Sequence, residues 1–247
     1  MRLALMNWPA VEAYLQDGSG IIIPIGSTEQ HGPTGLIGTD ALTAEAMADR
    51  VGETLSVPVA PVIPVGMAHH HMSFPGSMTL RPSTLIALVR DWVDSLSSHG
   101  FKRFLFINGH GGNIPSVQAA FYEIYEENRR RDGGEAPDVQ CRLCSWFLTP
   151  PVARLTKEYY GDSEGQHATP SELAVTWALH PDLTDQRELE PRIGPMGRFT
   201  DSRNFRATFP DGRMGSDPSL ATPEAGQAFL DQTAAHIAQD HRAFLTE

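Results

Sequence analysis

Positive charge and long apolar runs are both scarce in this sequence, and each scarcity excludes a class of partner. Acidic residues outnumber basic ones, which gives a formal net charge of −11 and a pI near 5.3. Such a surface repels phosphate backbones and anionic lipid, so we expect neither nucleic acid nor a membrane as a partner. No apolar stretch approaches the roughly 20 residues of a membrane span. Residues 1–15 turn polar too soon for a secretory signal. We therefore expect a cytoplasmic protein.

Cysteine is equally rare, because only Cys141 and Cys144 occur. Their C-x-x-C spacing can mark a redox pair or half of a zinc site. The surrounding residues 139–147 instead have the character of a strand, on which positions three apart face opposite sides. A tetrahedral zinc site would also need a second ligand pair of matching spacing, which the sequence lacks. We expect both thiols to lie in the core.

Apolar, β-rich runs alternate with helical segments along the 247 residues, a length within reach of one α/β domain. This alternation predicts parallel strands joined by crossover helices. The four predicted strands are residues 21–25, 57–65, 104–107 and 139–147. Pro58, Pro61 and Pro64 cannot donate to a strand ladder, so the second run is expected to be an edge strand or an irregular one. No linker divides the chain, and we predict a single α/β domain over residues 1–247.

Helices are predicted from apolar stripes and from the residues that end them. Residues 82–99 carry apolar side chains at helical spacing and stop at Gly100. Residues 114–130 follow Asn113 as a candidate N-cap, and a terminal helix is predicted over residues 223–244.

Residues 190–216 show no clear periodicity and are rich in glycine, proline and arginine. A loop of this length in a compact domain is usually functional or an interface. Five arginines concentrate positive charge there: Arg192, Arg198, Arg203, Arg206 and Arg213. The segment is interpreted as a subunit contact or solvated loop, or else as a lid over the site.

A carboxylate and an imidazole lie just beyond the first predicted strand. Glu29 and His31, in PIGSTEQHG (24–32), are two residues apart, so an extended backbone would point both side chains the same way. Open α/β sheets bind ligands beyond the carboxyl ends of strands, and this pair of groups suits Zn, Mn or Fe. Asp40, in GTDA (38–41), could add a second carboxylate. Taken alone, Asp40 is better explained as a cap of the next helix, a role worth roughly 1 kcal/mol that needs no metal.

A glycine-rich loop with a central histidine follows the third predicted strand. In FLFINGHGGN (104–113), Gly109, Gly111 and Gly112 allow tight turns around His110. Such a loop can instead cradle phosphate at a helix N-terminus, but this one lacks the lysine and the spacing of the usual phosphate-binding motifs. A metal ligand is the favoured interpretation of His110, with phosphate binding as the alternative.

The third motif is GQHATPSELAV (165–175). Thr169, Pro170 and Glu172 fit a capping box, with threonine at the cap and glutamate three residues on. That role does not account for His167, which lies just outside the helix start and could act as an acid–base group near neutral pH.

Together these motifs resemble the creatininase (creatinine amidohydrolase) family. The resemblance rests on GSTEQHG followed by TD, on NGHGGN and on H-A-x-x-x-E, which here runs from His167 to Glu172. MSFPGSMTL (72–80) is similar to the family's F-P-G-T segment, and GSDPSLATPEAG (215–226) is similar to its G-D-P-x-x-A-T tail. The five motifs follow the family's order and span residues 20–226.

The resemblance implies a three-layer α/β/α domain with a mainly parallel sheet, a dinuclear site for zinc, manganese or iron, and homo-oligomers, often hexamers. The implied metal ligands are Glu29, His31, Asp40, His110 and Glu172. Carried over by position, Glu29 and His110 would serve one metal and His31 the other. Asp40 would bridge the two metals, and Glu172 would complete the set.

Gly112 departs from the family pattern. Creatininase proper has a metal-binding carboxylate two residues after the loop histidine, so Glu172 must supply the missing ligand or one metal binds less tightly. Creatinine is therefore not expected to be a good substrate, and the H-G-G-N form is similar to relatives that hydrolyse other small amides, formamides or peptides. In AHHHMSFPG, His71 fits a family histidine. His70 and His71 are candidate substrate contacts, although His69 and His70 could simply be a polar loop.

The implied reaction is hydrolysis of a C–N bond in a small amide, cyclic or linear. Two divalent ions would lower the pKa of a shared water toward neutrality, and the resulting hydroxide would attack the carbonyl. His167, or Glu172 if it is not a ligand, would carry a proton to the leaving nitrogen, so no serine or cysteine nucleophile is needed. Three alternatives stay open. The same metals could act on a formamide, a peptide terminus or a cyclic ketone; the protein could bind metal without turnover; or the NGHGGN loop could bind phosphate.

Overall fold

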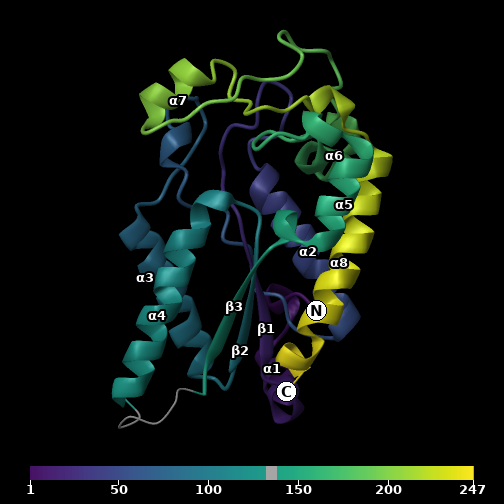
Figure 1. Ribbon diagram of the computed structural model, residues 1–247. Coiled ribbons are helices and arrows are strands. Elements are labelled where there is room, and N and C mark those ends of the chain that lie inside the picture. Colours follow the sequence, from purple (N-terminus) through teal and green to yellow (C-terminus); the bar gives the residue numbers. More distant parts are fainter. Residues whose placement is uncertain (132–137, 247) are drawn as a thin grey trace.

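The computed structural model describes residues 1–131 and 138–246 around a parallel sheet (Figure 1). Its strands are β1 (Gly20–Ile25), β2 (Arg103–Asn108) and β3 (Gln140–Ser145), hydrogen-bonded in the order β1-β2-β3. Every residue of β1 is buried, as expected of a strand that is covered on both faces. Three of the four predicted strands therefore form close to their predicted bounds.

The run at residues 57–65 follows the outer edge of β1 without forming a regular strand. Val59 and Ile63 make isolated parallel bridges to Ile22 and Ile25. Next to the first bridge, the Ile22 N–H donates to Pro58 O at 3.0 Å. Proline supplies no N–H for a continuous ladder, so the expected irregular edge is confirmed.

Helices cover both faces of the sheet, which produces the predicted three-layer arrangement (Figure 1). One face is covered by α1 (Trp8–Asp17), α3 (Pro82–Ser97) and α4 (Ile114–Arg131). The other is covered by α2 (Thr39–Leu55) and α8 (Pro223–Thr246), with α5 (Pro150–Tyr159) and α6 (Pro170–Leu179) packed on α8. The short helix α7 (Ser202–Thr208) lies beyond the carboxyl ends of the strands. Across residues 1–131 and 138–246, no helix has both the length and the apolar character that a membrane crossing requires.

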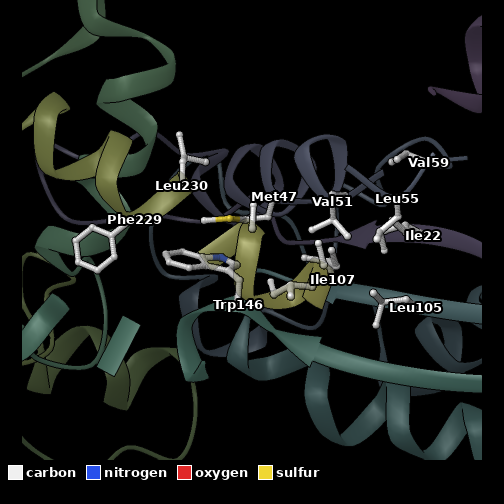
Figure 2. Close-up of a cluster of buried hydrophobic side chains, with 14 of the residues drawn as sticks. Ile22, Met47, Val51, Leu55, Val59, Leu105, Ile107, Trp146, Phe229 and Leu230 are labelled. Atoms are coloured by element: carbon white, nitrogen blue, oxygen red, sulfur yellow. The ribbon is translucent and has the colours of Figure 1, made fainter. Parts of the chain in front are cut away.

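Successive side chains of each strand enter two different hydrophobic cores. The core against α3 and α4 contains Ile21, Ile23, Phe104 and Phe106. The core against α2 and α8 contains Ile22, Leu105 and Ile107 together with Met47, Trp146 and Phe229 (Figure 2). The same alternation separates the two free cysteines, because Cys141 belongs to the first core and Cys144 packs against the second. Burial raises the pKa of each thiol to about 12. The prediction of core cysteines is confirmed for Cys141, which is buried, and only in part for Cys144, which is partly buried.

The predicted capping role of Asn113 is wrong. Asn113 ends a short 3₁₀ turn, η3 (Gly111–Asn113), and its side-chain amide forms hydrogen bonds with residues that are distant in the sequence. The amide nitrogen donates to Gly26 O at 2.9 Å, and the amide oxygen accepts from the Met67 N–H at 3.0 Å. Asn113 therefore joins three loops at the carboxyl edge of the sheet. The local sequence could not reveal these distant partners.

Residues 190–216 contain α7 and form a small hydrophobic core together with Phe74. That core consists of Phe74, Phe205, Phe209 and Met214, with Phe199 packed against it. Arg213 is fully buried, and its guanidinium donates to Arg192 O and Pro191 O and pairs with Asp211 at 2.7 Å. At least one arginine of this segment therefore serves to hold the segment itself together.

Candidate metal centre

The carboxyl ends of β1 and β2 bring the predicted ligands to one buried place. Glu29 and His31 follow β1, Asp40 is the second residue of α2, His110 follows β2, and Glu172 lies in the first turn of α6. Among the residues that the structure describes, three sets of candidate ligand atoms form, and the atoms of each set lie within 4.8 Å of one another. The sets are Glu29–Asp40–His110, His31–Asp40–Glu172 and Glu29–His31–His167. Residues far apart in the sequence therefore form one compact centre, which we call the ligand cluster.

Asp40 belongs to two of the three sets and lies between two histidines. Its Oδ1 is 3.0 Å from His31 Nε2, and its Oδ2 is 3.2 Å from His110 Nδ1. The N-cap position of α2 is Gly38, and no side chain caps that helix. The capping role that the sequence left open for Asp40 is therefore excluded, and both of its carboxylate oxygens face the cluster.

Two of the histidines are oriented by backbone carbonyls. His31 Nδ1 lies 3.1 Å from Glu29 O, and His110 Nε2 lies 3.0 Å from Met67 O. Because a carbonyl oxygen only accepts, these two nitrogens carry the protons. When the rings are neutral, the opposite nitrogens, His31 Nε2 and His110 Nδ1, offer lone pairs on the side of the carboxylates, as metal-ligating histidines usually do.

Glu172 has a structural role as well as a place in the cluster. The capping box predicted from the sequence is present: Thr169 Oγ1 accepts from the Glu172 N–H at 3.2 Å, and Glu172 Oε2 accepts from the Thr169 N–H at 3.0 Å. A carboxylate oxygen of Glu172 also lies within 4.8 Å of ligand atoms of His31 and Asp40. Helix capping and metal binding are therefore compatible at this residue.

Charge inside the cluster is balanced between carboxylates and imidazoles. Burial would raise the pKa of Glu29, but His110 and His71 outweigh it and hold that pKa well below the usual range. Burial would lower the pKa of His31, yet Asp40 raises it to about 9. The pKa of His110 is likewise raised, by Glu29 and Asp40 against burial. Burial raises the pKa of Glu172. The cluster thus provides anionic oxygen atoms beside imidazole nitrogens.

The donor atoms of the cluster fit a divalent cation. Within the described part of the chain, four of them are buried without a partner in hydrogen-bond geometry: both carboxylate oxygens of Glu29, His31 Nε2 and Asp40 Oδ2. Buried charges are normally paired or coordinate a metal. A mixed set of carboxylates and imidazoles suits Zn, Mn or Fe. The residues present therefore agree with the metals that the resemblance implies.

A cavity of about 310 Å³ opens onto the cluster. Its walls include His70, His71, Phe147, Gln166, Phe199, Met214 and the loop from Gly109 to Gly112. The ring of His70 stacks on Phe199, with centroids 5.0 Å apart. Burial lowers the pKa of His70 to about 3, so this imidazole is neutral. His69 is exposed and is not among the wall residues.

Gly112 is required by the position of His110. A Cβ at residue 112 would lie 2.4 Å from His110 Nε2 and 2.4 Å from Met67 O. Contacts this short force atoms to move, and the two atoms concerned are hydrogen-bonded to each other. A side chain at position 112 is therefore incompatible with the observed place of the His110 ring.

Anion binding by the NGHGGN loop is disfavoured by its neighbours. His110 Nδ1 lies 3.2 Å from both Glu29 Oε1 and Asp40 Oδ2. A phosphate beside His110 would meet these carboxylates and be repelled. The surroundings of the loop therefore favour a cation over the phosphate alternative.

Residues 161–165 spell GDSEG and so match the G-x-S-x-G pattern of serine hydrolases. In those enzymes the serine lies on a turn between a strand and a helix. Here the run follows helix α5 and includes the 3₁₀ turn η5 (Gly161–Ser163). Ser163 therefore lacks the setting of a nucleophile.

The sequence analysis missed several residues of the site. Gln30 contacts His71 and His167. Its position in the sequence between Glu29 and His31 could have indicated that it belongs to the site. Phe147, Gln166, Phe199 and Met214 line the cavity. Gln166 lies in the third motif, beside His167, whereas the local sequences of Phe147, Phe199 and Met214 carry no motif and only the fold identifies these three.

Known proteins with related sequences differ in activity. A sequence model of the creatininase family, described as creatinine amidohydrolase, matches residues 4–240. The mycofactocin precursor peptide peptidase of Mycolicibacterium smegmatis is 36% identical, covering 84% of this chain and 78% of its own. The creatinine amidohydrolase of Pseudomonas putida is 28% identical, with 73% and 72% covered. The 3-dehydro-scyllo-inosose hydrolase of Thermotoga maritima is also 28% identical, with 91% and 74% covered.

Solved structures with the same fold include metal-bound forms. A manganese form of creatininase is 24% identical to this chain, covers all of it and 99% of its own length, and has a TM-score of 0.83. A Zn–Zn form of a creatininase variant is also 24% identical, with 100% and 98% covered and a TM-score of 0.84. At this level of identity the likeness shows the fold, and it confirms the predicted three-layer α/β/α class.

Proposed function

The chain belongs to the creatininase family, and on that premise we propose that it is a metal-dependent amidohydrolase that cleaves a C–N bond of a small polar amide. The observation that carries this proposal is the set of four buried donor atoms of Glu29, His31 and Asp40 that lack hydrogen-bond partners. Two groups of ligand atoms that share Asp40 provide room for up to two divalent ions, with zinc and manganese favoured by the related structures.

The proposed ligands divide between the two groups. Glu29 and His110 would hold one cation and His31 and Glu172 the other, with Asp40 between them. When bound, such cations act as Lewis acids toward a carbonyl oxygen and lower the pKa of a bound water. The vacancy left by Gly112 is compensated in this proposal by Glu172, whose carboxylate approaches from the first turn of α6.

His167 is the proposed acid–base group. Its Nε2 lies 2.8 Å from Gln30 O, so this nitrogen donates and Nδ1 carries the lone pair. Nδ1 faces the cluster at 4.0 Å from Glu29 Oε1. Burial and the neighbouring His71 and His31 hold the pKa of His167 well below its usual value. The ring is therefore able to accept a proton from an attacking water and to return it to the leaving nitrogen.

The cavity favours a compact substrate without a negative charge. Aromatic and imidazole side chains form much of the wall, and His70 and His71 are the proposed substrate contacts. The described wall residues include neither lysine nor arginine, so no ammonium or guanidinium group is available there to a substrate carboxylate. Cyclic and linear neutral amides fit this lining.

A peptide amide is a second candidate substrate. The 36% identical relative is a peptide peptidase, and four consecutive positions of the cavity wall, Gly109 to Gly112, include three glycines. A wall with so few side chains leaves space for an extended backbone. Under either candidate, assembly into a homo-oligomer and a cytoplasmic location stay predictions.

Metal analysis combined with a hydrolysis screen tests the proposal. Protein purified without chelator is expected to contain more than one equivalent of Zn, Mn or Fe per chain. It is expected to hydrolyse at least one compound in a panel of formamides, cyclic amides, creatinine and terminal peptide amides. Less than half an equivalent of metal, with no rebinding of any of the three, would refute the metal centre. A fully loaded protein that turns over no member of the panel would contradict the amidohydrolase assignment.

A further inference from the structure

The side chain of Gln30 is buried beside His71 and His167, and two backbone groups fix its orientation. The Gly32 N–H donates to Gln30 Oε1 at 2.8 Å, and Gln30 Nε2 donates to Gly212 O at 3.1 Å. A backbone N–H requires an acceptor and a backbone carbonyl requires a donor. Exchanging the amide oxygen and nitrogen would place like groups against each other at both positions. The amide nitrogen therefore faces His71 and His167.

The two protons of that amide nitrogen have only two available acceptors. Gln30 Nε2 lies 3.0 Å from His167 Nε2, but that ring nitrogen already donates to the Gln30 backbone carbonyl at 2.8 Å. His167 Nε2 therefore carries a proton and cannot accept another. One amide proton goes to Gly212 O, and the second goes to His71 Nδ1 at 2.9 Å.

His71 is thereby restricted to one neutral tautomer. With Nδ1 accepting from Gln30, the ring proton must be on Nε2. His71 Nε2 lies 3.1 Å from Glu29 Oε1, so the ring proton lies on the nitrogen next to that carboxylate oxygen.

We propose that Gln30 is a positioning residue whose amide holds His71 as the Nε2–H tautomer, so that His71 orients the Glu29 carboxylate toward a bound cation. The role given to Glu29 rests on the proposed function, whereas the tautomer of His71 does not. Groups that orient a metal ligand typically change metal affinity 10–100-fold when they are removed.

The same amide connects the cluster to residues 190–216. Gly212 has a φ of +91°, and a Cβ there would lie 1.9 Å from Gln30 Oε1. Only glycine permits this close approach. Gln30 therefore joins Glu29, through His71, to the segment that also contributes Phe199 and Met214 to the cavity wall.

Histidine tautomers can be measured directly in the metal-free protein. In ¹⁵N-histidine-labelled protein, long-range ¹H–¹⁵N spectra distinguish protonated from unprotonated ring nitrogens, and the His71 signals are assigned by their loss in His71→Asn. We expect a proton on Nε2 and none on Nδ1 of His71. In Gln30→Glu the carboxylate can only accept, so Nδ1 of His71 is expected to become protonated. A proton on Nδ1 in the native protein, or an unchanged pattern in Gln30→Glu, would overturn the proposal.

Zinc affinity provides an independent measurement. We expect Gln30→Met, which keeps the length of the side chain but removes both hydrogen-bonding groups, to bind zinc about tenfold more weakly in competition with a chromophoric chelator. Gln118→Met, at an exposed position of α4, is the matched control and should leave the affinity unchanged. An unchanged affinity in folded Gln30→Met would overturn the proposal. If Gln30→Met does not fold, the tautomer in the native protein decides. Neither measurement needs turnover, so an inactive hydrolysis screen would count only against the proposed function.

Discussion

The neighbouring glycines of the NGHGGN loop allow a sharp test of how His110 is held. Gly111 and Gly112 are adjacent, and neither has the positive φ that would by itself exclude alanine. A Cβ at residue 111 would meet nothing within 4 Å, whereas one at residue 112 would lie 2.4 Å from both His110 Nε2 and Met67 O. The change from glycine to alanine is therefore chemically identical at the two positions, but its surroundings differ.

The cost of Gly112→Ala follows from these contacts. The methyl group would collide with both partners of the 3.0 Å hydrogen bond that orients His110. Overpacking a close-packed site costs about 1–3 kcal/mol, and the lost hydrogen bond adds about 1 kcal/mol. We expect the free energy of unfolding to fall by about 2–4 kcal/mol in Gly112→Ala. Gly111→Ala is expected to leave stability unchanged or to raise it by up to about 1 kcal/mol, because the unfolded chain loses freedom.

Chemical denaturation of the chelator-treated proteins measures this difference, and zinc titration measures its consequence for the site. A displaced His110 ring no longer aims Nδ1 at Glu29 and Asp40, so Gly112→Ala should bind zinc at least about tenfold more weakly than Gly111→Ala. Equal stability and equal zinc affinity of the two variants would refute the argument that His110 requires glycine at position 112.

Three further predictions concern other parts of the molecule. Asp40→Asn keeps the shape of a side chain that two ligand sets share, and elemental analysis should show that this variant loses most of its metal. Asp49→Asn, on the same helix as Asp40, removes only an exposed ion pair with Arg2 and should retain the metal. Wild-type metal content in Asp40→Asn would contradict the bridging role. Because the pKa of each thiol is about 12, each is ionised in only roughly one molecule in 10⁴ at pH 8. The buried Cys141 and the partly buried Cys144 should therefore resist iodoacetamide in the folded protein and react after unfolding. Rapid labelling of Cys141 in the native state would disprove its burial. Because Gly112 stands where creatininase proper has a carboxylate, steady-state assays with creatinine should give a kcat/KM well below ~10⁴ M⁻¹s⁻¹. A value at or above that level would show that the glycine at position 112 does not alter specificity.

Local patterns were sufficient for the elements that bury a continuous apolar run or carry a clear cap. β1 and β2 were predictable because their residues are apolar on both faces, as a doubly covered parallel strand requires. The capping box of α6 was predictable because both of its bonds join residues only three positions apart. The separation of Cys141 from Cys144 followed from the alternation of a strand.

Other predictions failed or stayed open because the deciding partner is distant in the chain. Asn113 has the residue type of an N-cap, but Gly26 and Met67 bind its amide instead. Asp40 taken alone was better explained as a cap than as a metal ligand. The choice depends on His31 and His110, whose ring nitrogens lie about 3 Å from its carboxylate oxygens.

The sequence by itself thus determined the fold class, the main strands and helices, and the chemical types gathered in the motifs, because these depend on periodicity and on residues that are close in the chain. Only the tertiary structure decided which nitrogen of each histidine faces the centre, which glycine is sterically required, and which aromatic side chains of residues 190–216 border the cavity. Those properties depend on contacts such as Gln30 with Gly212 and His110 with Met67. Hydrogen bonds of this kind form only after strands, helices and loops from distant parts of the chain have packed at the same edge of the sheet.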